Sequence, residues 1–171
     1  ENVVDADNGG STVASIVTDG SITDDDGSPV EAIAVTGVDN TNGTWEYSTD
    51  GKSFSDIGSV AEDAALLLDE ADTTLIRFVP NANYNGDATI TYRAWDKSTG
   101  ANGDTNVDTS TNGNATAFST AKETATITVN AVNAVNTAPV LDNSGEPTLA
   151  AIDENVVDAD NGGSTVASIV T

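Results

Sequence analysis

The sequence predicts an all-β domain of two packed antiparallel sheets with about seven strands. Segments rich in Val, Ile, Thr and aromatic residues recur along the chain, and clusters of Gly, Asn, Asp and Thr separate them about every ten residues. Helix signals are nearly missing, because only the short segment 61–70, AEDAALLLDE, has a helical composition. A closed barrel is the alternative arrangement of the same strands.

Six segments have the residue content of strands, and in chain order they are 12–17, 30–38, 44–48, 75–79, 88–94 and 124–132. Two of these segments alternate clearly. One face of the fifth carries Ile90, Tyr92 and Ala94, and its other face carries Thr89, Thr91, Arg93 and, one residue further, Trp95. In the sixth, Ala125, Ile127 and Val129 share a face in the same way. We expect one face of each strand to be buried and the other to contact water.

The segments between the strands have the composition of turns and loops. Residues 39–43 (DNTNG) and 49–52 (TDGK) tolerate positive φ angles, so we expect hairpins on either side of Trp45. Residues 97–117 contain almost no apolar side chains and are expected to form a long surface loop.

The composition excludes several classes of function. The chain has 28 acidic and five basic residues, and a formal charge of −23 repels nucleic acids and anionic membranes. It has no cysteine and no histidine, so it can form neither a disulfide nor a thiolate metal site, and it lacks the commonest catalytic base. No nucleophile elbow, phosphate-binding glycine loop or membrane-spanning apolar run is present. We therefore expect that the protein is not an enzyme and is not inserted in a membrane.

A long exact repeat joins the two ends of the sequence. Residues 1–18 (ENVVDADNGGSTVASIVT) return unchanged as residues 154–171, which gives a period of 153 residues. A period of one whole domain predicts a tandem array whose partners are adjacent copies of the same repeat. We expect residues 1–136 to form a sandwich that lacks its own first strand. Residues 137–171 are then a linker and the opening strands of the next repeat, docked on the same molecule or strand-swapped onto a neighbour.

Acidic turns in this sequence have the chemistry of calcium sites, because calcium binds roughly six to eight oxygen ligands and flexible turns can supply them. Asp24 and Asp26 lie two residues apart in the strongest such cluster, TDDDGS. Asp5 and Asp7 begin a second cluster, DADNGG, which lacks the bidentate acid of a helix-flanked calcium loop. A third set in the long loop has the same spacing and is equally consistent with a solvated loop: Asp104, Asn106 and Asp108.

Several motifs occur in an order that resembles the cadherin-like repeats of large bacterial adhesins. They are RFVPNANYNG (77–86), RAWD (93–96) and AFSTAKETATITVNAVNAVNTAPVL (117–141). The resemblance covers nearly the whole repeat and implies an immunoglobulin-like (cadherin-like) antiparallel β-sandwich with Greek-key connections. It also implies calcium ligands at Glu1 and its copy Glu154, at Asp24 with Asp26, at Asp96 and at Asn136. The linker departs from the family pattern, since Thr137 stands where an aspartate is usual, so one junction ligand is either missing or replaced by Asp142 or Asp153.

More narrowly, the chain resembles the extender modules of RTX-type surface adhesins. Such proteins leave the bacterium by type I secretion and hold a terminal binding region away from the cell surface during adhesion and biofilm formation. The resemblance implies a secreted structural spacer that calcium stiffens. The alternative is a binding module that contacts carbohydrate, ice or another cell through calcium bound in the loop around Asp104–Asp108.

Overall fold

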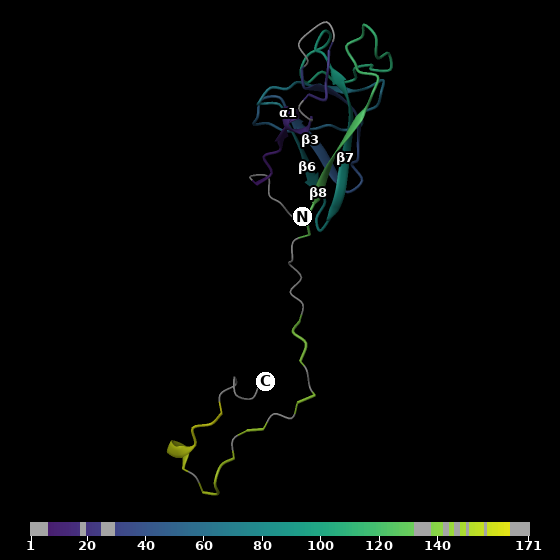
Figure 1. Ribbon diagram of the computed structural model, residues 1–171. Coiled ribbons are helices and arrows are strands. Elements are labelled where there is room, and N and C mark those ends of the chain that lie inside the picture. The colour runs from purple at the N-terminus through teal and green to yellow at the C-terminus, as the bar shows by residue number, and fades with distance from the viewer. Residues whose placement is uncertain are drawn as a thin grey trace. The chain divides into compact units, whose positions relative to one another are not determined.

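The structure is a computed structural model that describes residues 7–17, 20–24, 30–131, 138–141, 144–145, 148–149, 151–155 and 157–164 (Figure 1). The chain divides into two compact units, Glu1–Asn133 and Ala134–Thr171. The first unit contains all the strands. No helix among the described residues is long and apolar enough to cross a membrane.

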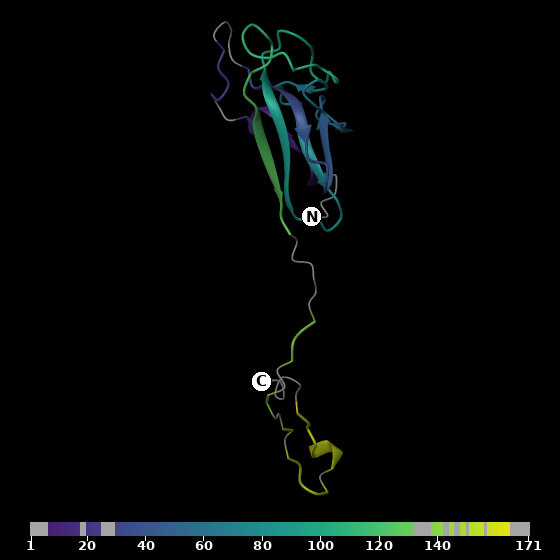
Figure 2. The same ribbon diagram turned by 90° about the vertical axis from the view of Figure 1, so that its right-hand side faces the viewer.

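Two four-stranded antiparallel sheets form the first unit, as the sequence predicts (Figure 2). The first sheet has the order β1-β6-β3-β4, with β1 Ser11–Thr12, β6 Leu75–Pro80, β3 Gly43–Ser48 and β4 Ser55–Asp56. The second has the order β5-β2-β7-β8, with β5 Leu66–Leu68, β2 Ala32–Val38, β7 Gly86–Trp95 and β8 Glu123–Val129. Five of the six predicted strands therefore exist, with bounds that differ by a few residues.

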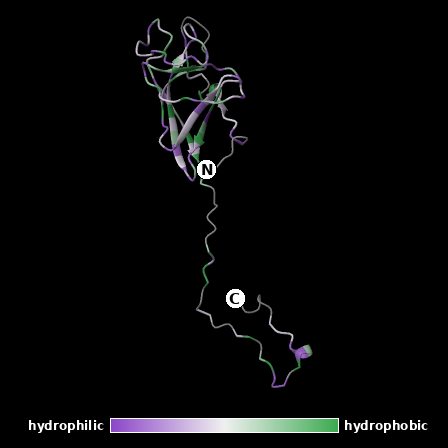
Figure 3. Cartoon of the chain, turned by 180° about the vertical axis from the view of Figure 1, so that it is seen from behind, coloured by the Kyte–Doolittle hydropathy of each residue, from purple (hydrophilic) through white to green (hydrophobic). Residues whose placement is uncertain are grey.

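The main core lies between the two sheets. Ile33, Val35 and Ile90 from the second sheet pack with Trp45 and Phe78 from the first. The Trp45 and Phe78 rings are tilted to each other, with centroids 5.3 Å apart. Figure 3 shows hydrophobic residues in the strands and hydrophilic residues in most of the loops. The alternation of β-branched and aromatic residues in the strands produces this core, because every second side chain points between the sheets.

The segment 12–17 was expected to be one strand, and this prediction is wrong. Only Ser11 and Thr12 pair with β6, and the chain then turns into the short helix α1, Val13–Ile16. Thr12 caps this helix by accepting a hydrogen bond from the amide of Ser15. Val13 is fully buried in the main core, so this segment contributes apolar side chains even though it does not continue as a strand.

The helical composition of 61–70 is also misleading, because its centre is the strand β5. Leu66, Leu67 and Leu68 are all buried, and β5 pairs with β2 from Ile33 to Val35. Three consecutive leucines fit a strand only if both faces of the sheet are covered. Leu66 and Leu68 belong to the main core, whereas Leu67 belongs to a second cluster on the outer face.

One of the two predicted hairpins is present. Residues 49–52 connect β3 and β4, which pair at Glu46–Asp56 and Tyr47–Ser55. Residues 39–43 instead carry the chain from β2 in one sheet to β3 in the other, so they form a crossover between sheets. Local turn composition is the same in both cases, and only the packing of the strands distinguishes them.

The long loop is on the surface but is packed against the second sheet. Val107 pairs with Ala65 by two backbone hydrogen bonds of 2.8 and 3.0 Å. Trp95, Ala117 and Phe118 form the second cluster with Leu67 and with alanines of β2. The expected wet face of β7 is therefore buried at Arg93 and Trp95. Gly100 permits the close approach, since its φ is 80° and a Cβ there would collide with Leu67.

The second unit contains little regular structure among its described residues. It has one 3₁₀ helix, Asp158–Asp160, in the repeated eighteen-residue stretch. The large apolar side chains that are described in this unit are exposed, and they are Val140, Leu141, Leu149, Ile152 and Val157.

Candidate functional site

A depression of about 570 Å³ lies at the end of the sandwich that carries the long loop. Asp24, from the segment before β2, and Asp96, directly after β7, both line it. The structure thus places two of the predicted calcium ligands, far apart in the sequence, on one concave surface. Ser98, Asn114 and Thr116 add hydroxyl and amide groups to its wall.

Asp96 is held in place by the chain around it. Its backbone amide donates to the carbonyl of Ala117 at 3.1 Å, which ties the end of β7 to the end of the long loop. Its Oδ1 accepts a hydrogen bond of 2.7 Å from the amide of Ser98. The next residue, Lys97, has a φ of 65° and turns the chain away from the strand. The side chain of Asp96 is exposed, so its second oxygen can reach a ligand.

Asp24 is half-buried at the edge of the same depression. Its predicted partner Asp26 lies outside the described residues, as does the rest of the segment 25–29. Among the residues that are described, no group of three or more acidic side chains is arranged to hold a metal ion. The described part of this site therefore offers two carboxylates together with neutral oxygen donors.

Sequence reasoning did not select Asn114, although it borders this depression. Asn114 follows Gly113, and both have positive φ angles, 53° and 74°. The letters N-G-N in the loop are the signal that could have indicated such a turn, since Asn and Gly tolerate this conformation. The carbonyl oxygen of an asparagine side chain is also a usual calcium ligand.

The loop acids Asp104 and Asp108 are used in local turns. Asp104 Oδ2 accepts a hydrogen bond of 2.8 Å from the amide of Ala101. Asp108 Oδ1 accepts bonds from the hydroxyl of Ser110 at 2.6 Å and from its amide at 2.9 Å, and these two bonds lower the pKa of Asp108. Asn106 lies between them with a φ of 58°. Both carboxylates therefore have a structural role in shaping the loop.

The other predicted ligands, those of the junction and of the cluster at Asp5 and Asp7, are divided between the two units. Glu1, Asp5, Asn136 and Asp142 lie outside the described residues. Asp7 is exposed beside the start of β1, and Asp153 and Glu154 are exposed in the second unit. In the repeated stretch, Asp160 is the copy of Asp7, and both residues are in 3₁₀ conformation. Ligation at the junction stays a prediction.

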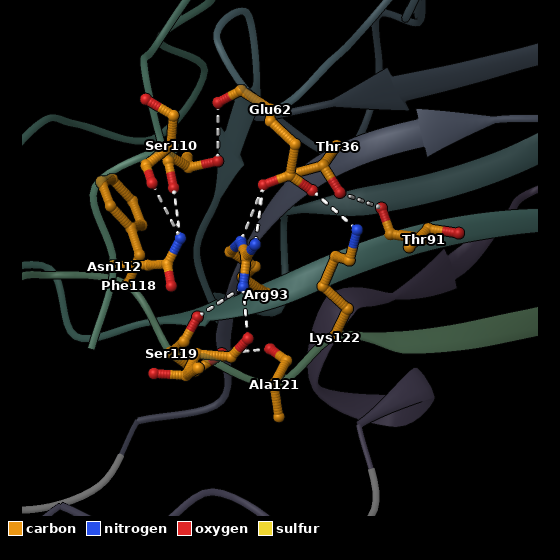
Figure 4. A network of polar contacts seen from close by, with 12 residues as sticks. Thr36, Glu62, Thr91, Arg93, Ser110, Asn112, Phe118, Ser119, Ala121 and Lys122 are labelled. Atoms are coloured by element: carbon orange, nitrogen blue, oxygen red, sulfur yellow. Dashed lines mark hydrogen bonds and ion pairs between the residues drawn. The ribbon is translucent and has the colours of Figure 1, made fainter.

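A buried arginine fixes the long loop next to this site (Figure 4). The Arg93 guanidinium donates to Glu62 Oε2 at 2.8 and 3.0 Å and to the carbonyls of Ser119 and Thr120 at 2.8 and 2.6 Å. Lys122 donates to the other oxygen of Glu62 at 3.0 Å. Burial opposes ionisation of Glu62, but the bonds from Lys122 and Arg93 outweigh it and lower its pKa.

Ion pairs with glutamates use most of the basic residues in the described part of the chain. Four of the five basic residues pair with glutamates in the described part of the chain, in the pairs Arg77–Glu46, Arg93–Glu62, Lys97–Glu70 and Lys122–Glu62. The acidic surplus, 28 residues against five, is far larger than these contacts can neutralise.

Comparison of the chain with protein-family models, with curated proteins and with solved structures finds no match.

Proposed function

We propose that this chain is a calcium-stabilised extender repeat of a giant secreted bacterial adhesin. In this proposal its two sheets form an immunoglobulin-like sandwich with Greek-key connections. Successive copies form a stalk at the bacterial surface that projects a terminal ligand-binding region during adhesion and biofilm formation. The adjacent copies are its partners, and rigidity is its activity.

The observation that carries this proposal is the meeting of Asp24 and Asp96 around one depression rich in oxygen atoms. Both positions are those at which the resemblance to cadherin-like repeats implies calcium ligands. A hard cation that prefers oxygen ligands suits this donor set, which contains no nitrogen or sulfur ligand from His or Cys. The carboxylates of Asp24 and Asp96 and the side-chain oxygen of Asn114 would hold it, and the ion would supply positive charge that offsets these carboxylates.

The excess of negative charge gives this binding an energetic reason. Like charges on one sandwich repel each other, and the repulsion is strongest where acidic turns gather. A divalent ion bound between the carboxylates of such a turn replaces their mutual repulsion with attraction of each carboxylate to the ion. Calcium modules outside the cell bind at about 10⁻⁴ to 10⁻³ M, so sites of this class fill after secretion and empty inside the cell.

The loop around Asp104–Asp108 gives less support to the alternative, a module that binds carbohydrate, ice or a partner cell. Its backbone is paired with the segment that leads into β5, and Thr109 is completely buried. Asp104 and Asp108 are engaged in turns of the loop itself. A spacer also fits the exact repetition of the sequence better than a selective binder does.

Thermal unfolding in calcium and in EDTA tests the proposal. For a site with a dissociation constant of about 10⁻⁴ M, calcium at about fifty times that concentration stabilises the fold by about 2 kcal/mol. This stabilisation should raise the melting temperature by roughly 5 °C. Magnesium at the same ionic strength should have a smaller effect, since it prefers a stricter octahedral site.

Asp96→Asn should remove most of the calcium-dependent shift, because it keeps the acceptor for Ser98 but loses the charge. Asp56→Asn is the matched control, since Asp56 is an exposed aspartate at the end of β4. It should keep the full shift. Equal melting curves in calcium and EDTA for the unmodified chain would refute the calcium part of the proposal.

A further inference from the structure

The flank of the sandwich between β1 and β8 contains a groove whose lining is partly apolar and partly polar. Its volume is about 250 Å³, and Ile16, Trp45, Ile76, Ile90 and Ile127 contribute its apolar lining. The groove opens where the two sheets face each other with free edges, since β1 and β8 are each the last strand of their sheet.

β8 has an inward-facing apolar side chain that the described part of the sandwich leaves partly uncovered. Ala125 and Val129 point inward and pack against the main core. Ile127 lies between them in the same alternation, but its side chain is 37% exposed. Among the described residues, β8 pairs only with β7, so its other edge presents unpaired backbone groups.

The side chain of Trp45 gives independent evidence that the groove binds a further segment. It is 4% exposed, and its indole Nε1–H is the single buried side-chain polar group without a hydrogen-bond partner in the described part of the chain. A buried donor without an acceptor costs about 1–3 kcal/mol. Trp45 lines the groove, so a strand placed there would cover this side chain.

The second unit has apolar side chains that are not buried in a core. Six large hydrophobic side chains are exposed in the described residues, and five of them lie in the second unit. The sixth is Ile127 of the groove. Val140, Leu141, Leu149 and Ile152 all belong to the segment 138–153, which leads directly into the repeated stretch.

We propose that the segment 138–153 of a second copy inserts into this groove as an additional strand between β1 and β8. The repeat fixes the register, because Asp153 directly precedes the copy of residue 1. In a tandem array, the donated strand is therefore followed directly along the chain by the segment that leads into β1. It pairs with a free sheet edge through its backbone and places its apolar side chains over the groove.

The direction of the strands favours a second copy over the chain's own tail. Asn8 donates to the carbonyl of Phe78, and Val129 pairs with Gly86, so β1 begins at the end of the sandwich where β8 ends. A strand that finishes at this end runs parallel to β8. A parallel connection needs about a dozen residues or more, whereas residues 130–137 provide only eight.

This inference deepens the spacer function, because it names how consecutive copies join, and it rests on that function only for its biological role. Its test is made at one fixed calcium concentration, so that its failure leaves the calcium experiment unaffected. The full chain is compared with Leu149→Asp, which places a charge in the donated strand. Asn161→Asp adds the same charge to the tail outside that strand and is the matched control.

The first readout is hydrogen exchange of the two tryptophan indoles, measured by NMR. Trp95 Nε1 already donates to the carbonyl of Thr99 at 2.7 Å and serves as the internal reference. We expect the Trp45 indole to exchange roughly tenfold more slowly in the unmodified chain than in Leu149→Asp. Equal exchange in these two proteins overturns the proposal.

The second readout is molar mass from analytical ultracentrifugation over a range of concentrations. We expect mass to increase with concentration for the unmodified chain and for Asn161→Asp, but not for Leu149→Asp. Ile127→Thr, which keeps a β-branched residue in β8, should also lose association. A protected Trp45 indole in a protein that stays monomeric would assign the groove to the chain's own tail and overturn the proposal of a second copy. Association that survives Ile127→Thr would place the contact elsewhere.

Discussion

At the scale of single residues, Asp50 determines the shape of the turn between β3 and β4. Its Oδ1 accepts hydrogen bonds from the amides of Ser53 at 2.7 Å and Lys52 at 2.8 Å, and from the hydroxyl of Ser48 at 2.9 Å. These bonds favour the ionised carboxylate. They lower the pKa of Asp50 far below its ordinary value, with the Ser53 amide making the largest contribution.

The lowered pKa of Asp50 predicts a specific dependence of stability on pH. The stabilisation is complete above the pKa of an unfolded aspartate, near 4, and is lost as pH falls toward the folded pKa. Asp50→Asn should therefore be less stable than the unmodified chain at pH 7, and the difference should shrink between about pH 4 and pH 2. Urea unfolding at a series of pH values measures it. A difference that stays constant over this range would contradict the prediction.

At the scale of elements, the long loop acts as a third layer over part of the second sheet. Its apolar cover is thin: Val107 and Ala117 of the loop, with Phe118 directly after it, join the apolar cluster on the outer face of this sheet. Arg93 compensates by joining β7 to Glu62 on one side and to Ser119 and Thr120 on the other. The layer is therefore fixed by polar contacts as much as by apolar packing.

Replacement of Arg93 should loosen this layer. Arg93→Met removes hydrogen bonds from a side chain that is 8% exposed, and we expect a loss of about 2–3 kcal/mol in the free energy of unfolding. Lys97→Met is the matched control, since the pair Lys97–Glu70 is 37% and 34% exposed and should contribute less than about 1 kcal/mol. Equal losses in urea unfolding of the two variants would show that Arg93 has no special role.

The sequence predicts elements whose signals are local and misses those whose stability comes from distant segments. The alternation in 88–95 and 124–129 correctly identifies β7 and β8. The leucines of β5 appear helical because nothing near them in the sequence shows that residues 103–118 cover Leu67. In the same way, Asp24 and Asp96 could be selected one by one, but their common depression depends on how the strands pack.

At the scale of the whole molecule, charge determines how copies of the repeat behave in series. A net charge of −23 per chain extends a string of modules at low ionic strength by repulsion alone. Simple salt screens that repulsion and should shorten the string. Calcium held at the ends of modules should have the opposite effect, because it restricts bending where one copy meets the next.

Small-angle X-ray scattering of several consecutive repeats separates these two effects. We expect the maximum dimension to increase when calcium replaces sodium chloride at equal ionic strength, and to return to its initial value after addition of EDTA. The calcium-insensitive control is the same array with Asp24 and Asp96 changed to asparagine in every copy. Identical scattering profiles in both salts would contradict the spacer function even if each module binds calcium.

The covered edge of β5 has a consequence for crowded cell surfaces. Strand-to-strand merging of two molecules requires an accessible sheet margin on each of them. In the described sandwich the margins at β1 and β4 are two residues long, and the margin at β5 is occupied by the loop from Gly103 to Thr109. Among the described strands, β8 alone offers a long accessible margin, so each sandwich can join one further strand in this way. If the chain forms the proposed stalks, those that pack side by side should therefore remain separate filaments and should not fuse laterally into a continuous fibrous mat.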